Sequence, residues 1–189
     1  ALKTYYPNMK FKLFNYGIGG ETVMDGLSRL GETYDYKDRH YPNILSLKAD
    51  IIIVESFAYN PLGGSQSTLY QSTLAAILRT VKLSCKHTIF LATIAPLQDT
   101  FGKGPNGVNW DSQIASSHAD TITSLLKQGM KIARDLYVPV IDVYHNSLLP
   151  DGKSNPEYVN TNDGIHPSIA GHKFIADTIA AFLVNNKYW

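Results

Sequence analysis

The chain has 189 residues, 44% of them hydrophobic and 17% charged. It can bury one sizeable core, and it is too short for two ordinary domains. Its 17 basic and 16 acidic residues nearly balance and are interspersed, so we expect no nucleic-acid partner and no anionic membrane surface as partner. The single cysteine excludes an intramolecular disulfide and a cysteine-based metal cluster. The longest apolar run, residues 51–54, is far below the roughly 20 residues of a membrane span.

Four short segments are typical of buried strands: residues 11–15, 50–55, 88–94 and 138–143. Each is rich in β-branched or aromatic residues and ends at Gly, Pro, Asn or a polar cluster. Apolar residues at helical spacing predict four helices, over residues 21–30, 67–84, 112–136 and 168–183. The same periodicity places Leu69 and Ile114 on buried helix faces.

Strands that alternate with helices and are apolar on both faces indicate a parallel sheet covered on each side. We therefore predict one α/β domain over residues 1–189, a three-layer α/β/α sandwich of the flavodoxin-like kind. Ligands of such folds bind beyond the carboxyl ends of the strands, so we expect the loops 98–111 and 144–162 to form pocket walls.

The first residues resemble the exit from a helix that leads straight into strand 11–15. A doubly wound domain normally begins with a strand that becomes central in the sheet. We therefore expect that a first strand and most of a helix are missing upstream, and that the domain is N-terminally truncated.

The stretch NDGIHPS, residues 162–168, puts an aspartate three positions before a histidine and ahead of the last helix. An aspartate bound to one ring nitrogen fixes the tautomer of the imidazole, while the other nitrogen can take a proton. Asp163 and His166 are therefore a candidate acid and base. The alternative is that Asp163 only caps the helix.

Two turns after strands could hold a developing negative charge. The stretch NYGIGGET, residues 15–22, would present backbone N–H groups at a helix start. It matches a dinucleotide fingerprint only loosely, because Thr22 replaces the third glycine, and a tight turn alone would also explain the glycines. In ESFAYN, residues 55–60, Asn60 offers an amide donor, although Asn before Pro is also a plain turn former.

Taken in order, these three stretches resemble the blocks of the SGNH hydrolase (GDSL esterase/lipase) superfamily over essentially the whole chain. The resemblance implies that Asp163 is the acid, His166 the base, and the Gly20 N–H and the Asn60 amide the oxyanion donors, with no cofactor. An alignment without gaps would place Tyr59 at the asparagine position instead. The implied activity is a Ser-His-Asp esterase, acting on a small ester or an acylated carbohydrate with an acetyl or short acyl group.

The Gly-Asp-Ser block that supplies the family's nucleophile is absent from these residues. Four other serines do not sit on a sharp strand-to-helix elbow and are not expected to replace it: Ser56, Ser65, Ser116 and Ser117. We expect the serine and the first strand to come from a companion N-terminal segment or chain, without which residues 1–189 would be inactive. The alternatives are a non-catalytic binding module for a glycan or protein and a nucleotide-binding protein. The compartment stays open, with a secreted or cell-surface location favoured.

Overall fold

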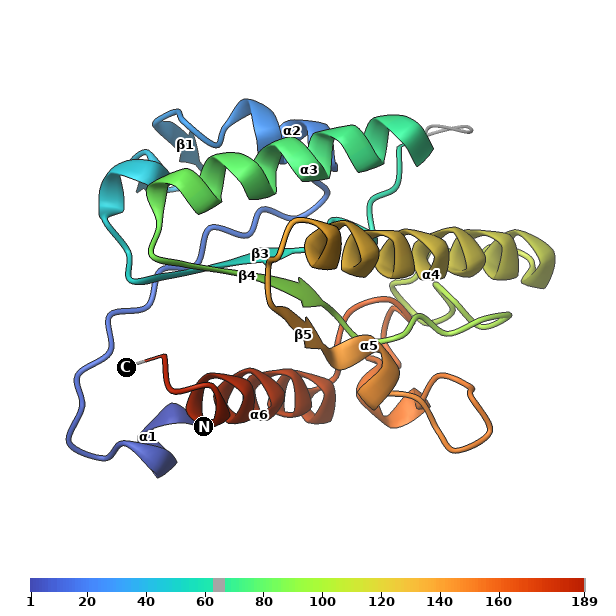
Figure 1. The fold of residues 1–189 in the computed structure, drawn as a ribbon. Helices are drawn as coiled ribbons and strands as arrows, with labels where there is room; N and C mark the ends of the chain where they lie inside the picture. Colours follow the sequence, from blue (N-terminus) through green and yellow to red (C-terminus); the bar gives the residue numbers. More distant parts are fainter. Residues whose placement is uncertain (63–66, 189) are drawn as a thin grey trace. The chain divides into compact units, whose positions relative to one another are not determined.

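The computed structural model describes residues 1–62 and 67–188. Its helices, in chain order, are α1 (Leu2–Tyr5), α2 (Val23–Ser28), α3 (Ser67–Ser84), α4 (Ser112–Asp135), α5 (Val143–Asn146) and α6 (Ile169–Asn185). Its strands are β1 (Tyr34–Tyr36), β2 (Arg39–Tyr41), β3 (Ile51–Glu55), β4 (His87–Ala92) and β5 (Val140–Asp142). Figure 1 shows these elements along the chain. No helix of the described ranges is long and apolar enough to cross a bilayer.

The main sheet has three strands in the order β3-β4-β5. β3 and β4 pair in parallel, from Ile51 opposite His87 to Glu55 opposite Leu91, and α3 forms the crossover between them. β3 lies at one end of this order. The predicted α/β class and parallel sheet are confirmed.

The described chain divides into two compact units. Unit 1 comprises residues 1–9, 92–126 and 141–189, and unit 2 comprises residues 10–91 and 127–140. The boundaries between the two units fall within α4 and β5, so each unit is built from separate segments of the chain.

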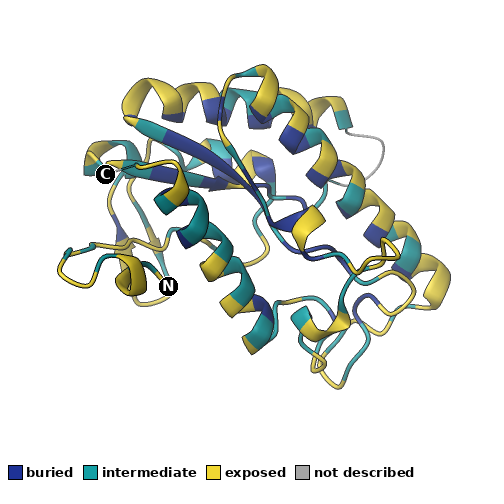
Figure 2. Ribbon diagram, turned by 60° about the horizontal axis from the view of Figure 1, so that its bottom comes forward, coloured by how far each residue is buried: buried dark blue, intermediate teal, exposed yellow. Residues whose placement is uncertain are grey.

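Unit 2 contains the parallel pair and the helix α3. One side of α3 is fully buried through Leu74, Ile77, Leu78 and Val81. β4 is buried along almost all of its length, and Figure 2 shows the long helices with a buried side and an exposed side. Gly129 of α4 lets this helix approach closely, since a Cβ there would lie 2.6 Å from the Phe90 ring and 3.3 Å from Leu74. α2 also packs against α3.

In unit 1, the helix α6 packs on the short turn of residues 156–158. The rings of Tyr158 and Phe174 stack at 4.5 Å, and a Cβ on Gly171 would lie 2.1 Å from the Tyr158 carbonyl oxygen. Ser168 caps α6 by accepting a hydrogen bond from the Gly171 N–H at 3.0 Å. The start of this helix is thereby fixed next to the Asp163 stretch.

Two expectations about individual elements are wrong, and one element was missed. Residues 11–15 form no strand in the described structure, and Leu13 is 81% exposed. A strand needs a neighbour to bond its backbone, and this segment belongs to no ladder of the described chain. Leu69 and Ile114 are exposed rather than buried, because both lie in the first turn of their helices, at the rim of the apolar face. The antiparallel hairpin of β1 and β2 was not predicted.

Candidate active site

Asp163 and His166 contact each other as their spacing predicts. Asp163 Oδ2 lies 3.0 Å from His166 Nδ1, while Asp163 Oδ1 accepts hydrogen bonds from the Ile165 N–H at 2.8 Å and the His166 N–H at 2.9 Å. The Asp163 side chain is 17% exposed and that of His166 71% exposed. His166 Nε2 has no hydrogen-bond partner among the described residues. The arrangement holds one ring nitrogen and leaves the other accessible for proton transfer.

The environment of Asp163 favours its charged form. Burial opposes ionisation, but the two backbone N–H donors and the His166 ring outweigh it and lower the pKa of the Asp163 carboxyl. Asp163 is not the cap of the last helix, because Ser168 fills that role. The interpretation of Asp163 as only a helix cap is therefore wrong.

A second pair in unit 1 repeats this geometry. Asp142 Oδ2 lies 2.7 Å from His145 Nδ1, and Asp142 Oδ1 accepts from the His145 N–H at 3.0 Å. The two side chains are 27% and 50% exposed. The sequence analysis missed this pair, although its Asp-x-x-His spacing at the end of β5 could have predicted it.

The glycine turn leads into α2. Gly20 has a positive φ of 83°, and its N–H has no acceptor within the described ranges, so it is free to donate to a ligand. The start of α2 is already occupied by a capping box, in which Asp25 accepts from the Thr22 N–H at 2.8 Å and Thr22 accepts from the Asp25 N–H. A carboxylate at this position repels a phosphate, which argues against the nucleotide-binding alternative.

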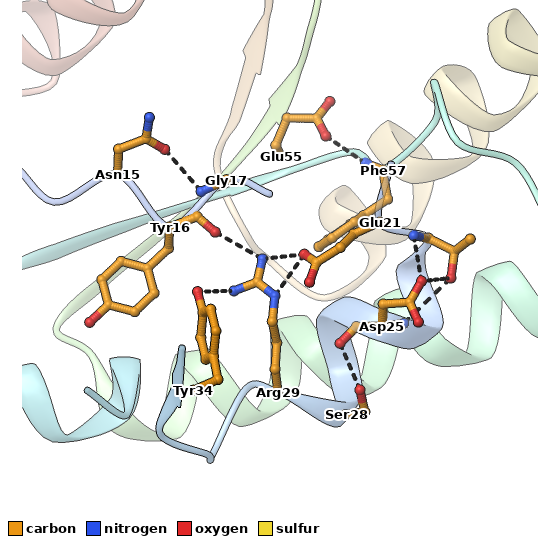
Figure 3. A network of polar contacts seen from close by, with 11 residues as sticks. Asn15, Tyr16, Gly17, Glu21, Asp25, Ser28, Arg29, Tyr34, Glu55 and Phe57 are labelled. Atoms are coloured by element: carbon orange, nitrogen blue, oxygen red, sulfur yellow. Dashed lines mark hydrogen bonds and ion pairs between the residues drawn. The ribbon is translucent and has the colours of Figure 1, made fainter. Parts of the chain in front are cut away.

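Arg29 holds the glycine turn from both sides (Figure 3). Its guanidinium donates to the Tyr16 carbonyl at 2.9 Å, to Glu21 Oε2 at 2.7 Å and to the Tyr34 hydroxyl at 3.0 Å. The Arg29 and Glu21 side chains are only 18% and 16% exposed. Tyr16 precedes the glycines and Glu21 follows them, so a single side chain fixes both ends of the turn.

The asparagine turn follows β3 directly. Glu55 accepts from the Ser56 hydroxyl at 2.5 Å and from the Phe57 N–H at 2.7 Å, and Phe57 has a positive φ of 57°, which is strained for an aromatic residue. Burial raises the pKa of the Glu55 carboxyl, although both hydrogen bonds oppose the rise. Glu55 nevertheless keeps exposed surface. Because water reaches the carboxyl, the rise in its pKa is smaller than full burial would cause.

Asn60 closes this turn through a hydrogen bond from its N–H to the Phe57 carbonyl at 3.3 Å. Its side-chain amide has no partner in the described part of the chain. Burial strongly raises the pKa of the neighbouring Tyr59, and this tyrosine has an interaction partner. A free amide is the better donor, which favours Asn60 over Tyr59 as the oxyanion residue.

Of the four serines weighed in the sequence, the three that the structure describes lack the surroundings of a nucleophile. Ser56 is fully buried and bound to Glu55, and Ser116 and Ser117 lie within α4. Ser65 lies outside the described residues. The structure thus brings together Asp163 and His166 in unit 1 and places Gly20 and Asn60 in unit 2. That the four residues form one site stays a prediction.

The family model for GDSL-like lipases/acylhydrolases matches residues 2–179. No curated protein matches the chain.

Several solved structures share the fold at low sequence identity. A GDSL-like lipase from Bacteroides thetaiotaomicron is 16% identical with a TM-score of 0.64, covering 88% of this chain and 73% of that one. An acetyl xylan esterase is 18% identical with a TM-score of 0.65, covering 96% and 86%. A variant of the acetyl xylan esterase from Geobacillus stearothermophilus is 20% identical with a TM-score of 0.56, covering 96% and 75%.

Proposed function

Because the chain belongs to the GDSL-like lipase/acylhydrolase family, we propose that it acts as a serine esterase. The observation that carries the proposal is the Asp163–His166 contact, in which the carboxylate binds Nδ1 and both backbone N–H groups of the turn while Nε2 stays accessible. This is the arrangement of a general base with its orienting carboxylate.

In the proposed mechanism, a serine hydroxyl attacks the ester carbonyl and passes its proton to His166 Nε2. Asp163 holds the ring in the tautomer that accepts this proton and stabilises the resulting cation. The Gly20 N–H and the Asn60 amide donate to the oxyanion that forms on the carbonyl oxygen. His166 then returns the proton to the leaving alcohol, and water releases the acyl group from the serine by the reverse sequence.

The proposal places the nucleophilic serine outside residues 1–189. It is supported by the absence of a Gly-Asp-Ser block from the sequence. It is also supported by β3, which lies at an end of the sheet, and by residues 11–15, which have a strand-like sequence without a strand ladder. A companion strand bound along β3 would satisfy backbone groups at this edge and bring the serine with it.

For the substrate we propose an acetyl or other short acyl ester on a carbohydrate. Two of the similar structures are described as acetyl xylan esterases, and this chain shares their fold. The proposed site residues need no cofactor for such a reaction.

The test compares two histidine variants of the full-length gene product, His166→Ala and His145→Ala. Loss of the base should lower the rate of acetyl release from acetylated xylan and 4-nitrophenyl acetate by about 10³-fold or more. His145→Ala is the matched control, since it removes a ring with the same local geometry, and it should retain activity within about threefold. Equal effects of the two substitutions would overturn the assignment of His166.

A further inference from the structure

Two loops of unit 1 lie with their backbones in direct contact: residues 101–109 and the stretch 160–166 that carries Asp163. The Gly102 N–H donates to the Gly164 carbonyl at 3.1 Å, and the Asn106 N–H donates to the Asn162 carbonyl at 2.8 Å. The Asn106 amide adds a bond to Asn162 Oδ1 at 3.1 Å. The position of the Asp163 turn therefore depends on the shape of the neighbouring loop.

Three glycines make this approach sterically feasible. A Cβ on Gly104 would lie 2.5 Å from the Asn162 carbonyl oxygen, and one on Gly107 would lie 2.8 Å from the Asp163 carbonyl oxygen. A Cβ on Gly164 would lie 2.6 Å from the Lys103 carbonyl oxygen. Real Cβ atoms do not approach oxygen so closely, so larger residues would force the two backbones apart.

Asn109 closes the glycine-rich loop with its side chain. Its Nδ2 donates to the carbonyls of Gly104 at 2.8 Å and Gly107 at 3.0 Å, and its Oδ1 accepts from the Gly104 N–H at 3.2 Å. Its own N–H donates to the Gly102 carbonyl at 2.9 Å. Asn109 is exposed and has a positive φ of 53°, a conformation that asparagine tolerates better than most residues.

We propose that Asn109 is a positioning residue for the Asp163–His166 pair. It fixes the glycine-rich loop, which holds the 162–164 backbone, and this backbone orients the Asp163 carboxylate toward the His166 ring. The importance of Asn109 for catalysis rests on the proposed role of His166 as the base. The effect of Asn109 on the structure of the pair is independent of that role. Asn109 touches neither the reacting groups nor the two side chains of the pair directly.

The test measures the pair itself by NMR in the full-length gene product, as wild type and as Asn109→Gly, Asn109→Asp and Asn109→Ala. Glycine keeps the backbone conformation but loses the side-chain bonds, and aspartate cannot donate to the Gly104 and Gly107 carbonyls. In all three variants we expect the Ile165 and His166 amides to exchange with solvent about tenfold faster or more. We also expect the ¹⁵N shifts of the His166 ring to show a mixture of tautomers instead of one.

A second variant and a control separate this effect from misfolding. Asn106→Ala removes only the side-chain bond between the loops and should give the same change to a smaller degree. Thr100→Ala, at an exposed position of the preceding turn, should match the wild type. Unchanged exchange and an unchanged tautomer in Asn109→Gly would overturn the proposal, even if His166 proves to be the base. Full activity of His166→Ala would instead overturn the proposed function and leave these NMR results standing.

Discussion

The Asp163 carboxylate binds the His166 ring through Oδ2 and two backbone N–H groups of its own turn through Oδ1. The Asp-x-x-His pattern predicted the contact with His166, and the structure confirms it at 3.0 Å. The same spacing in Asp142 and His145 shows that the pattern alone does not identify a base. Asn109 could not be predicted, because its role depends on a backbone approach between two loops far apart in the sequence.

The ionisation of Asp163 predicts how stability changes in acid. Its pKa is lowered in the folded chain, so its charge contributes to the free energy of unfolding above the ordinary aspartate pKa of about 3.9. This contribution is lost as the pH falls through the lowered folded pKa. Urea unfolding between pH 7 and pH 3 should therefore show a steeper loss of stability for the wild type than for Asp163→Asn. Parallel curves for the two proteins would contradict this account.

At the scale of elements, strong periodicity gave reliable predictions and short segments did not. Helix α3 has the predicted bounds, because apolar residues recur at helical spacing along it and form a buried stripe from Tyr70 to Val81. The hairpin of β1 and β2 has strands of three residues each, too short for an alternating pattern to be recognised. Residues 11–15 have a strand-like composition, but composition does not supply the neighbouring strand that a ladder requires.

Because α2 packs closely on the asparagine turn, we expect alanine to be less favourable than glycine at position 26, against the usual helix propensities. Alanine is usually favoured over glycine within a helix by about 0.8–1 kcal/mol. In Gly26→Ala, however, the new Cβ would lie 2.5 Å from the Phe57 ring, and such overpacking typically costs about 1–3 kcal/mol. We expect a lower urea midpoint for Gly26→Ala. Gly31→Ala, where nothing lies within 4 Å of the new Cβ, should not show this loss. Equal midpoints for the two variants would contradict the close approach.

At the scale of the whole molecule, the α/β class and the parallel sheet followed from the alternation of strands and helices. The family followed from three short stretches in a fixed order, each placed after a strand or before the last helix. The division into two units was not predicted, because it depends on contacts between distant segments. Gly20 and Asn60 lie in one unit, and Asp163 and His166 lie in the other.

We propose that this chain works with a serine that lies outside residues 1–189. The decisive experiment treats the native gene product with a fluorophosphonate probe and locates the label by intact mass and peptide sequencing. We expect one label, on a serine outside these residues, and its loss in His166→Ala. A native product that takes no label would contradict serine acyl transfer and favour a non-catalytic binding module.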